Sequence, residues 1–175
     1  MSSALQDTLA QALDFAHRYV LEGTVEGVDD ELANRRPGGR SNSIGSTYAH
    51  LVLSEDQIVN GMLKGSKPLS DGDWAGRTGV DRPMPWSSTE ALAEWYRTVR
   101  VDVAACREYG RAVHEAVRDY ISGATEESLA REVELFGMKM STATAFEVFV
   151  IGHANSIGGE ISALKGVAGL KGYPF

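Results

Sequence analysis

The 175-residue sequence contains a single cysteine, Cys106, and it has neither a long apolar run nor a basic run. A lone thiol cannot form an internal disulfide, which fits a reducing compartment. The lack of an apolar stretch of about 18 residues argues against a transmembrane helix. No basic segment followed by an apolar one opens the sequence, so we expect no signal peptide. These absences predict a cytoplasmic protein without a membrane partner.

Positive charge is also scarce, because 17 Lys and Arg residues face 24 Asp and Glu residues, for a formal net charge of −7. A protein that binds nucleic-acid phosphates needs a basic face, so we expect no nucleic-acid partner. The hydrophobic fraction of 43% is ordinary for a globular protein, and the length suffices for one full core. Since no repeat or linker divides the sequence, we expect a single domain over residues 1–175.

Strand-like alternation is almost absent, whereas four stretches carry apolar residues at spacings of three and four. The expected helices cover about residues 3–22, 43–63, 87–122 and 142–165. Gly23 is expected to end the first helix, and a Ser-Ser-Thr-Glu capping box begins the third. Only the segment 132–137 could be extended. This pattern predicts an all-α four-helix bundle with a long connection, residues 64–86, between the second and third helices.

His50 and His153 lie on the apolar faces of the second and fourth expected helices. An imidazole in such a place needs partners for its nitrogens, and either a metal ion or hydrogen bonds can supply them. Bundles build metal and ligand sites from inward side chains on facing helices. Two interpretations therefore stay open: a metal site, or a hydrogen-bonded pair in an apolar pocket. His17 and His114 lie on otherwise polar helix faces, where we expect them to be solvated.

Two separated motifs carry a family resemblance. Ser43-Ile44-Gly45, followed by Ala49-His50-Leu51 and Ser54-Glu55, resembles the second-helix signature of the DinB-like superfamily (DinB/YfiT-like proteins). The segment from His153 to Ile161, then Ala163-Leu164-Lys165-Gly166 and the Gly-rich Pro-Phe ending, resembles its C-terminal signature. The resemblance implies a four-helix bundle, a homodimer, and an enzyme with a divalent metal (Zn, Ni, Mn or Fe) held by three histidines. It also implies a transferase or isomerase that uses a low-molecular-weight thiol such as mycothiol, bacillithiol or glutathione.

The same resemblance implies which residues hold the metal. His50 matches the ligand from the second helix, and His153 matches the first histidine of a His-x-x-x-His pair on the last helix. The second histidine of that pair falls on Ile157, which has no donor atom. Glu160 lies about 10 Å along the helix from His153, too far for both to bind one ion. Three aspartates of the long connection are further candidates for a third donor: Asp71, Asp73 and Asp81.

Two functions therefore remain open on the sequence. One is a metal-dependent thiol transferase or isomerase with His50 and His153 as metal ligands, and the other is a non-catalytic bundle, without its metal, that binds a small molecule or dimerises. No catalytic residue can be named. We interpret the remaining distinctive residues structurally. Cys106 is expected to be a buried thiol, and Glu55 a surface or inter-helix hydrogen-bonding residue. The tryptophans Trp74, Trp86 and Trp95 are expected to be anchors, and helical glycines such as Gly45 and Gly158 to mark points of close helix approach.

Overall fold

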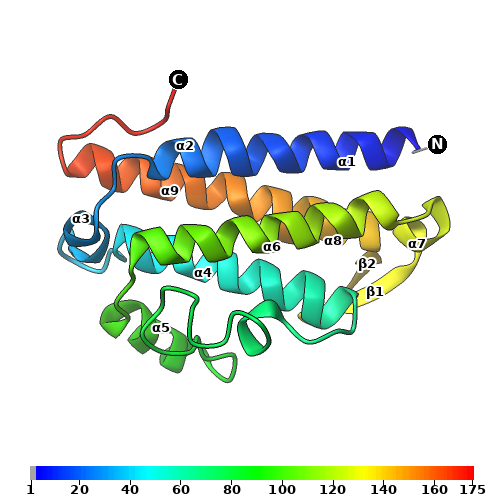
Figure 1. The fold of residues 1–175 in the computed structure, drawn as a ribbon, viewed down its shortest axis with the longest axis horizontal. Helices are drawn as coiled ribbons and strands as arrows, with labels where there is room; N and C mark the ends of the chain where they lie inside the picture. Colours follow the sequence, from blue (N-terminus) through cyan, green and yellow to red (C-terminus); the bar gives the residue numbers. More distant parts are fainter. Residues whose placement is uncertain (1–2) are drawn as a thin grey trace.

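Four long helical segments lie side by side in the computed structural model, which describes residues 3–175 (Figure 1). The first joins α1 (Ala4–Asp14), the π-helical η1 (Phe15–Leu21) and α2 (Glu22–Val25), and the second joins α4 (Ile44–Asp56) and the π-helical η2 (Gln57–Leu63). The third is α6 (Val103–Gly123), and the fourth joins α8 (Thr142–Phe146), the π-helical η4 (Glu147–Gly152) and α9 (His153–Val167). The predicted four-helix bundle is confirmed.

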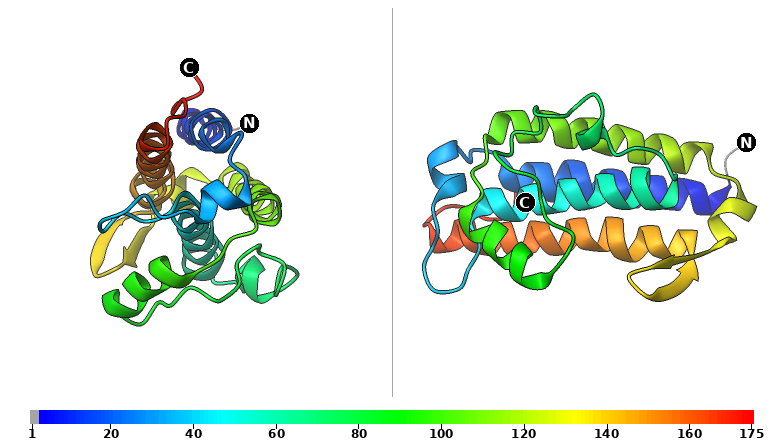
Figure 2. Two further views of the ribbon diagram at one scale, coloured as in Figure 1. Left: turned by 90° about the vertical axis from the view of Figure 1, so that its left-hand side faces the viewer. Right: turned by 90° about the horizontal axis from the view of Figure 1, so that it is seen from below.

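Seen end-on, the segments follow one another around the bundle in the order α1, α6, α4, α9 (Figure 2). Each contributes fully buried apolar side chains to one shared core, among them Leu13, Leu51, Val113 and Ile161. Burial of this apolar surface is the main force that holds the helices together. Gly45 and Gly158 lie where helices approach closely, since a Cβ atom at Gly158 would lie 2.6 Å from Val20 Cγ1.

Shorter elements connect the four segments. They are α3 (Asp30–Asn34), the 3-10 turn η3 (Leu69–Asp71), α5 (Thr89–Thr98), α7 (Glu126–Ala130) and the hairpin of β1 (Glu132–Leu135) and β2 (Met138–Ser141). The two strands pair antiparallel, with Leu135 opposite Met138. The hairpin accounts for the segment that the sequence marked as extended. Among residues 3–175, no helix is long and apolar enough to cross a membrane.

Two helix boundaries differ from the predictions. The expected third helix is divided into α5 and α6, because Val99 adopts an extended conformation and Val101 bridges to Val80 of the long connection. Asp102 then caps the start of α6 by accepting a hydrogen bond from the backbone of Ala105. Gly23 does not end the first helix. It lies inside α2, where a Cβ atom would meet the Pro174 ring at 2.9 Å, so close packing of the C-terminal segment explains this glycine.

Candidate functional site

His50 and His153 meet between two helices that pack against each other. His50 lies in α4, whose first turn is fixed by Ser43, which accepts a hydrogen bond from the backbone N–H of Ser46. His153 is the first residue of α9 and follows the π-helical η4 directly. The two imidazole rings meet edge to face, with their centroids 5.2 Å apart. The structure therefore brings together the two histidines that the sequence singled out.

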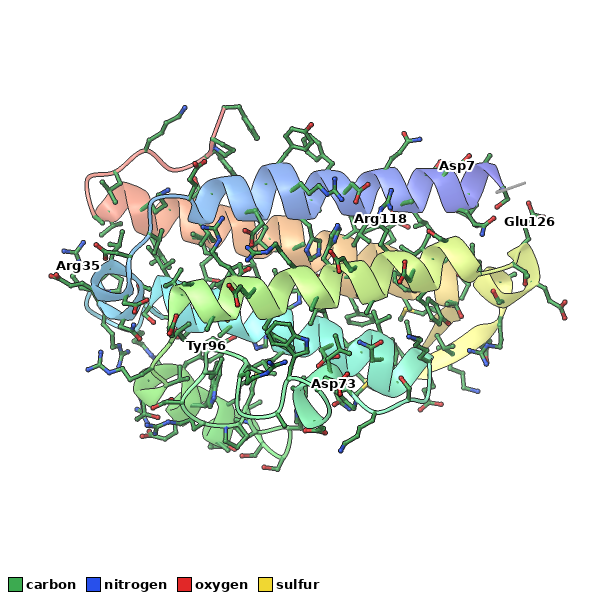
Figure 3. All side chains as sticks on the ribbon, in the orientation of Figure 1. Asp7, Arg35, Asp73, Tyr96, Arg118 and Glu126 are labelled. Carbon is green, nitrogen blue, oxygen red and sulfur yellow. The ribbon has the colours of Figure 1, made fainter. Side chains whose placement is uncertain are left out.

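The ring of His50 is held by the long connection and by α5. Its Nδ1 lies 3.4 Å from the sulfur of Met84, a buried residue between two prolines. Tyr96 of α5, labelled in Figure 3, also lies beside this ring, and the two ring centroids are 5.3 Å apart. These contacts fix the orientation of the imidazole and cover one side of it.

Burial favours the uncharged form of both histidines. Burial, and next the neighbouring His153, lower the pKa of His50 to about 4. Burial also lowers the pKa of His153, although Glu55 and Glu160 oppose that shift. A neutral imidazole offers one hydrogen-bond donor and one acceptor, so the pair presents both kinds of group without formal charge.

The side chains around the pair do not form the three-ligand metal site that the resemblance implies. The third ligand position is occupied by Ile157, which is only 7% exposed and packs into the apolar core. Glu160 is exposed and accepts a hydrogen bond from Thr47 at 3.2 Å. Within residues 3–175, no three His, Cys, Asp or Glu side chains are grouped so that they could hold a metal ion. The donor set is therefore one ligand short.

The aspartates of the long connection do not supply the missing donor. Asp81 pairs with Arg82 at 2.8 Å and also accepts a hydrogen bond from the backbone of Arg100. Asp71 and Asp81 line a separate hollow of about 440 Å³ whose lining contains neither histidine. Asp73 is exposed on the loop (Figure 3).

A cavity of about 630 Å³ lies beside the two histidines. It is bounded by α4, by η4 and the start of α9, by the segment that leads into α5, and by the tip of the β-hairpin. Its walls include Ile58, Trp86, Phe136 and Phe149, and the serines Ser54 and Ser156 also belong to the lining. Trp86 is thus a pocket residue that is 51% exposed, whereas Trp95 is the buried anchor that the sequence predicted.

The other two histidines are buried, which corrects the expectation that they are solvated. His17 is 5% exposed and His114 is 8% exposed, and their rings stack with centroids 4.6 Å apart. Nε2 of His17 lies 3.0 Å from Glu55, and Nε2 of His114 lies 3.1 Å from Asp14. Asp14 also binds Arg118, which lies on α6 facing α1 (Figure 3). Each of these histidines is therefore paired with a carboxylate from another helix.

The two buried histidines have opposite pKa shifts. Burial lowers the pKa of His17, but Glu55, together with Glu22 and Asp14, outweighs burial, so the net shift is upward from 6.5. Burial, and then His17, lower the pKa of His114 to about 4, although Asp14 opposes this. A signal for their burial was present in the sequence. His17 follows the core residue Leu13 by four positions, the spacing of one helix face.

Departures from regular helix surround this layer of the bundle. His17 lies within η1, Glu55 lies in the last turn of α4 before η2, and His153 follows η4. π-helical turns are rare and occur frequently at functional sites. The sequence pattern gave no indication of them, because one extra residue per turn changes the helical period only locally.

Comparisons with known proteins agree with this architecture. The family model of the DinB superfamily matches residues 15–156. A conserved protein from Enterococcus faecalis has a similar crystal structure, with a TM-score of 0.76 and 19% sequence identity over 95% of this chain and 97% of that chain. At this identity, the similarity shows the fold alone. None of the curated proteins compared with the chain matches it.

Proposed function

The chain belongs to the DinB superfamily, and we propose that it is a small-molecule-binding protein of that superfamily whose pocket beside His50 and His153 takes its ligand without a metal ion. The observation that carries this proposal is the buried Ile157 at the third ligand position. An apolar side chain there removes a donor and places hydrocarbon where a cation would need a ligand. Two imidazoles alone leave a divalent ion short of the three protein ligands usual at an open site.

The pocket has the properties of a ligand site. Its volume of about 630 Å³ lies within the range of small-molecule pockets, and its lining combines apolar walls with a few polar groups. The lining offers no strong nucleophile, since Cys106 is fully buried elsewhere and burial raises the pKa of its thiol. An imidazole with a pKa near 4, such as His50, is also a weak general base at neutral pH. These features support binding more directly than catalysis.

A second candidate function is the metal-dependent thiol transferase or isomerase that the family resemblance implies. The observation in its favour is the pairing of His50 and His153 at 5.2 Å between ring centroids, which brings two of the three family positions together. This function requires a third donor atom for Zn, Ni, Mn or Fe besides the two histidines, such as a substrate thiolate.

Metal content distinguishes the two candidates. We expect the purified protein to contain less than stoichiometric Zn, Ni, Mn and Fe by elemental analysis, before and after anaerobic loading with each divalent ion. Calorimetric titration of the parent protein with each ion should likewise show no one-to-one binding at this pair. The His153→Ala variant should therefore give the same titration as the parent. One ion bound per chain, lost in His153→Ala but retained in His17→Ala, would support the metalloenzyme and overturn our proposal.

Two further expectations from the sequence stay proposals: a homodimer and a cytoplasmic location. Light scattering coupled to size-exclusion chromatography would test the first, since the 175-residue chain has a mass of 18.9 kDa. Cell fractionation would test the second.

A further inference from the structure

The pocket beside His50 and His153 has no charged lining residue. Its fifteen lining residues include no Asp, Glu, Lys or Arg, although charged residues make up 23% of the chain. The polar side chains of the lining are the two imidazoles and the hydroxyl-bearing serines and threonine. A carboxylate, phosphate or ammonium group would therefore lose its hydration in this pocket without gaining a counter-charge.

Large apolar side chains from three separate elements converge on the pocket. Trp86 precedes α5, Phe136 forms the hairpin tip, and Val148 belongs to η4, and these side chains are 51%, 56% and 50% exposed. The hairpin and α5 project on the same side of the bundle (Figure 2). Exposed apolar side chains that gather around a hollow mark a ligand or partner site more often than isolated ones do.

Phe136 occupies a backbone position that is unfavourable for an aromatic residue. The two-residue turn of the hairpin has φ of 53° at Phe136 and 77° at Gly137. A hairpin turn with two positive φ angles favours Asn followed by Gly, because most side chains resist this conformation. The ring of Phe136 nevertheless meets Phe149 edge to face, with centroids 5.3 Å apart. Strained residues of this kind cluster at ligand sites.

Two polar residues of α4, His50 and Ser54, belong to the lining, but the Ser54 oxygen is closed off from the pocket. Ser54 is 4% exposed, and its Oγ makes no hydrogen bond within residues 3–175. Ser54 follows His50 by one helical turn, so the two side chains share the face of α4 that borders the pocket. The oxygen itself is inaccessible to solvent, so the polar side chain of α4 that a ligand can reach is that of His50.

We propose that this pocket binds an uncharged aromatic molecule whose rings lie among Trp86, Phe136 and Phe149 and whose single polar group faces His50. This inference rests on the proposed function and narrows its ligand class. It excludes thiols that carry carboxylates, such as glutathione, from this pocket, because no lining cation compensates their charge.

A matched pair of fluorescent probes tests the charge preference. N-phenyl-1-naphthylamine is neutral, and 8-anilino-1-naphthalenesulfonate has the same ring system with one sulfonate added. In fluorescence titrations of the full-length protein at pH 7, we expect the neutral probe to bind one per chain. The anionic probe should bind more weakly by about tenfold or more, because its charge stays unpaired.

Three variants locate the binding. Val148→Lys places a cation at the pocket rim and should shift the preference toward the sulfonate probe by about tenfold. Its matched control is Val167→Lys, which changes a 72% exposed valine at the end of α9 outside the lining and should leave both affinities unchanged. Phe136→Asn should weaken the neutral probe while the midpoint of thermal unfolding stays equal or rises, since Asn suits the turn.

The possible outcomes separate the two proposals. Equal or tighter binding of the sulfonate probe by the parent protein would overturn the ligand class and leave a small-molecule pocket in place. Saturable binding of neither probe would overturn both proposals. Neutral-probe binding that is unaffected by Val148→Lys and Phe136→Asn would place the probe elsewhere and overturn the inference.

Discussion

Nε2 of His17 lies 3.0 Å from Oε1 of Glu55 at the centre of the bundle, and both side chains are buried. The contact joins η1 to α4 in the layer that also holds His114. The second carboxylate oxygen of Glu55 has no hydrogen-bonding partner within residues 3–175. His17 is therefore the main group that compensates this buried carboxylate.

The first prediction is that Glu55→Leu destabilises the fold. Leucine has a similar volume, so the loss comes from the buried imidazole of His17, which is left without its acceptor. We expect the free energy of unfolding to fall by about 3 kcal/mol in urea titrations, as when one partner of a buried pair is removed. The control is Glu132→Gln, which breaks the exposed pair with Lys139 and should cost less than about 0.5 kcal/mol. Similar losses in both variants would contradict the central role of the His17–Glu55 pair.

The same variant tests a pH dependence. Because the pKa of His17 is raised above 6.5 in the folded protein, the pair contributes fully below pH 6.5. Its contribution is lost as the pH rises through the raised pKa. In Glu55→Leu, only burial and weaker charges remain, so the pKa of His17 should fall below 6.5. NMR titration of the His17 ring, together with unfolding at pH 6 and pH 9, measures both effects.

A second prediction concerns acid. The pKa values of His50 and His114 are lowered to about 4, so between pH 6.5 and 4 the unfolded chain binds protons that the folded protein does not. This contribution to stability is present above pH 6.5 and is lost as the pH falls toward 4. The parent should lose stability between pH 7 and 4, and His50→Gln should reduce that loss of unfolding free energy by about 1–3 kcal/mol. If the variant and the parent lost equal stability between pH 7 and 4, His50 would not be a source of the acid dependence.

The sequence predicted the bundle well because its evidence is local and repeated. Apolar residues at spacings of three and four mark the buried face of each long helix, and the core of Leu13, Leu51, Val113 and Ile161 is built from these stripes. The divided third helix was missed because Val99 and Val103 keep the helical spacing of four across the break between α5 and α6. Periodicity alone does not distinguish a short extended break from one more helical turn.

The candidate site was predicted less completely than the fold. The sequence placed His50 and His153 on inward faces, and the structure brings them together. It did not indicate that Phe136 and Trp86 line a pocket, because a wall formed by a hairpin tip and a loop depends on tertiary packing. It also misjudged His17 and His114, because their carboxylate partners, Glu55 and Asp14, come from other helices.

A third prediction is that Ile157→His creates a metal site that the parent lacks. A histidine four residues after His153 lies on the same helix face, so three imidazoles could then bind one ion. We expect one Zn²⁺ or Ni²⁺ per chain by elemental analysis and calorimetry. The control is the double variant Ile157→His with His50→Ala, which should lose the ion. Failure of Ile157→His to bind metal, with the fold intact by circular dichroism, would show that the pair lacks the family geometry.

A fourth prediction concerns Asp56, which anchors the long connection. Its carboxylate accepts hydrogen bonds from the backbones of Leu69 and Ser70 at 2.9 Å each and from the hydroxyl of Tyr109 at 2.6 Å. Asp56→Asn replaces one acceptor oxygen with a donor, so we expect a loss of about 2–3 kcal/mol. Faster hydrogen exchange at the Leu69 and Ser70 amides should accompany it. Asp71→Asn, an exposed neighbour, is the control and should leave exchange unchanged.

The fifth prediction compares two glycines of α9. A Cβ atom at Gly158 would lie 2.6 Å from Val20 Cγ1, whereas Gly166 has no such neighbour: among residues 3–175, nothing is found within 4 Å of a Cβ atom at Gly166. Gly158→Ala should therefore destabilise the protein by about 1–3 kcal/mol, despite the better helix propensity of alanine. Gly166→Ala meets no neighbour and should stabilise it by up to about 1 kcal/mol. Urea unfolding gives both values.

A double-mutant cycle identifies the cause of the Gly158 effect. Val20 is stiff at χ1 because it is β-branched, so its methyl group cannot swing away from a new Cβ atom at low cost. Val20→Ala alone should cost stability through the cavity it leaves. Combined with Gly158→Ala, it should remove the clash, so the pair should be less destabilised than the sum of the single variants by about 1 kcal/mol or more. Additive effects would show that another contact keeps residue 158 small, and that Val20 does not set the distance between η1 and α9.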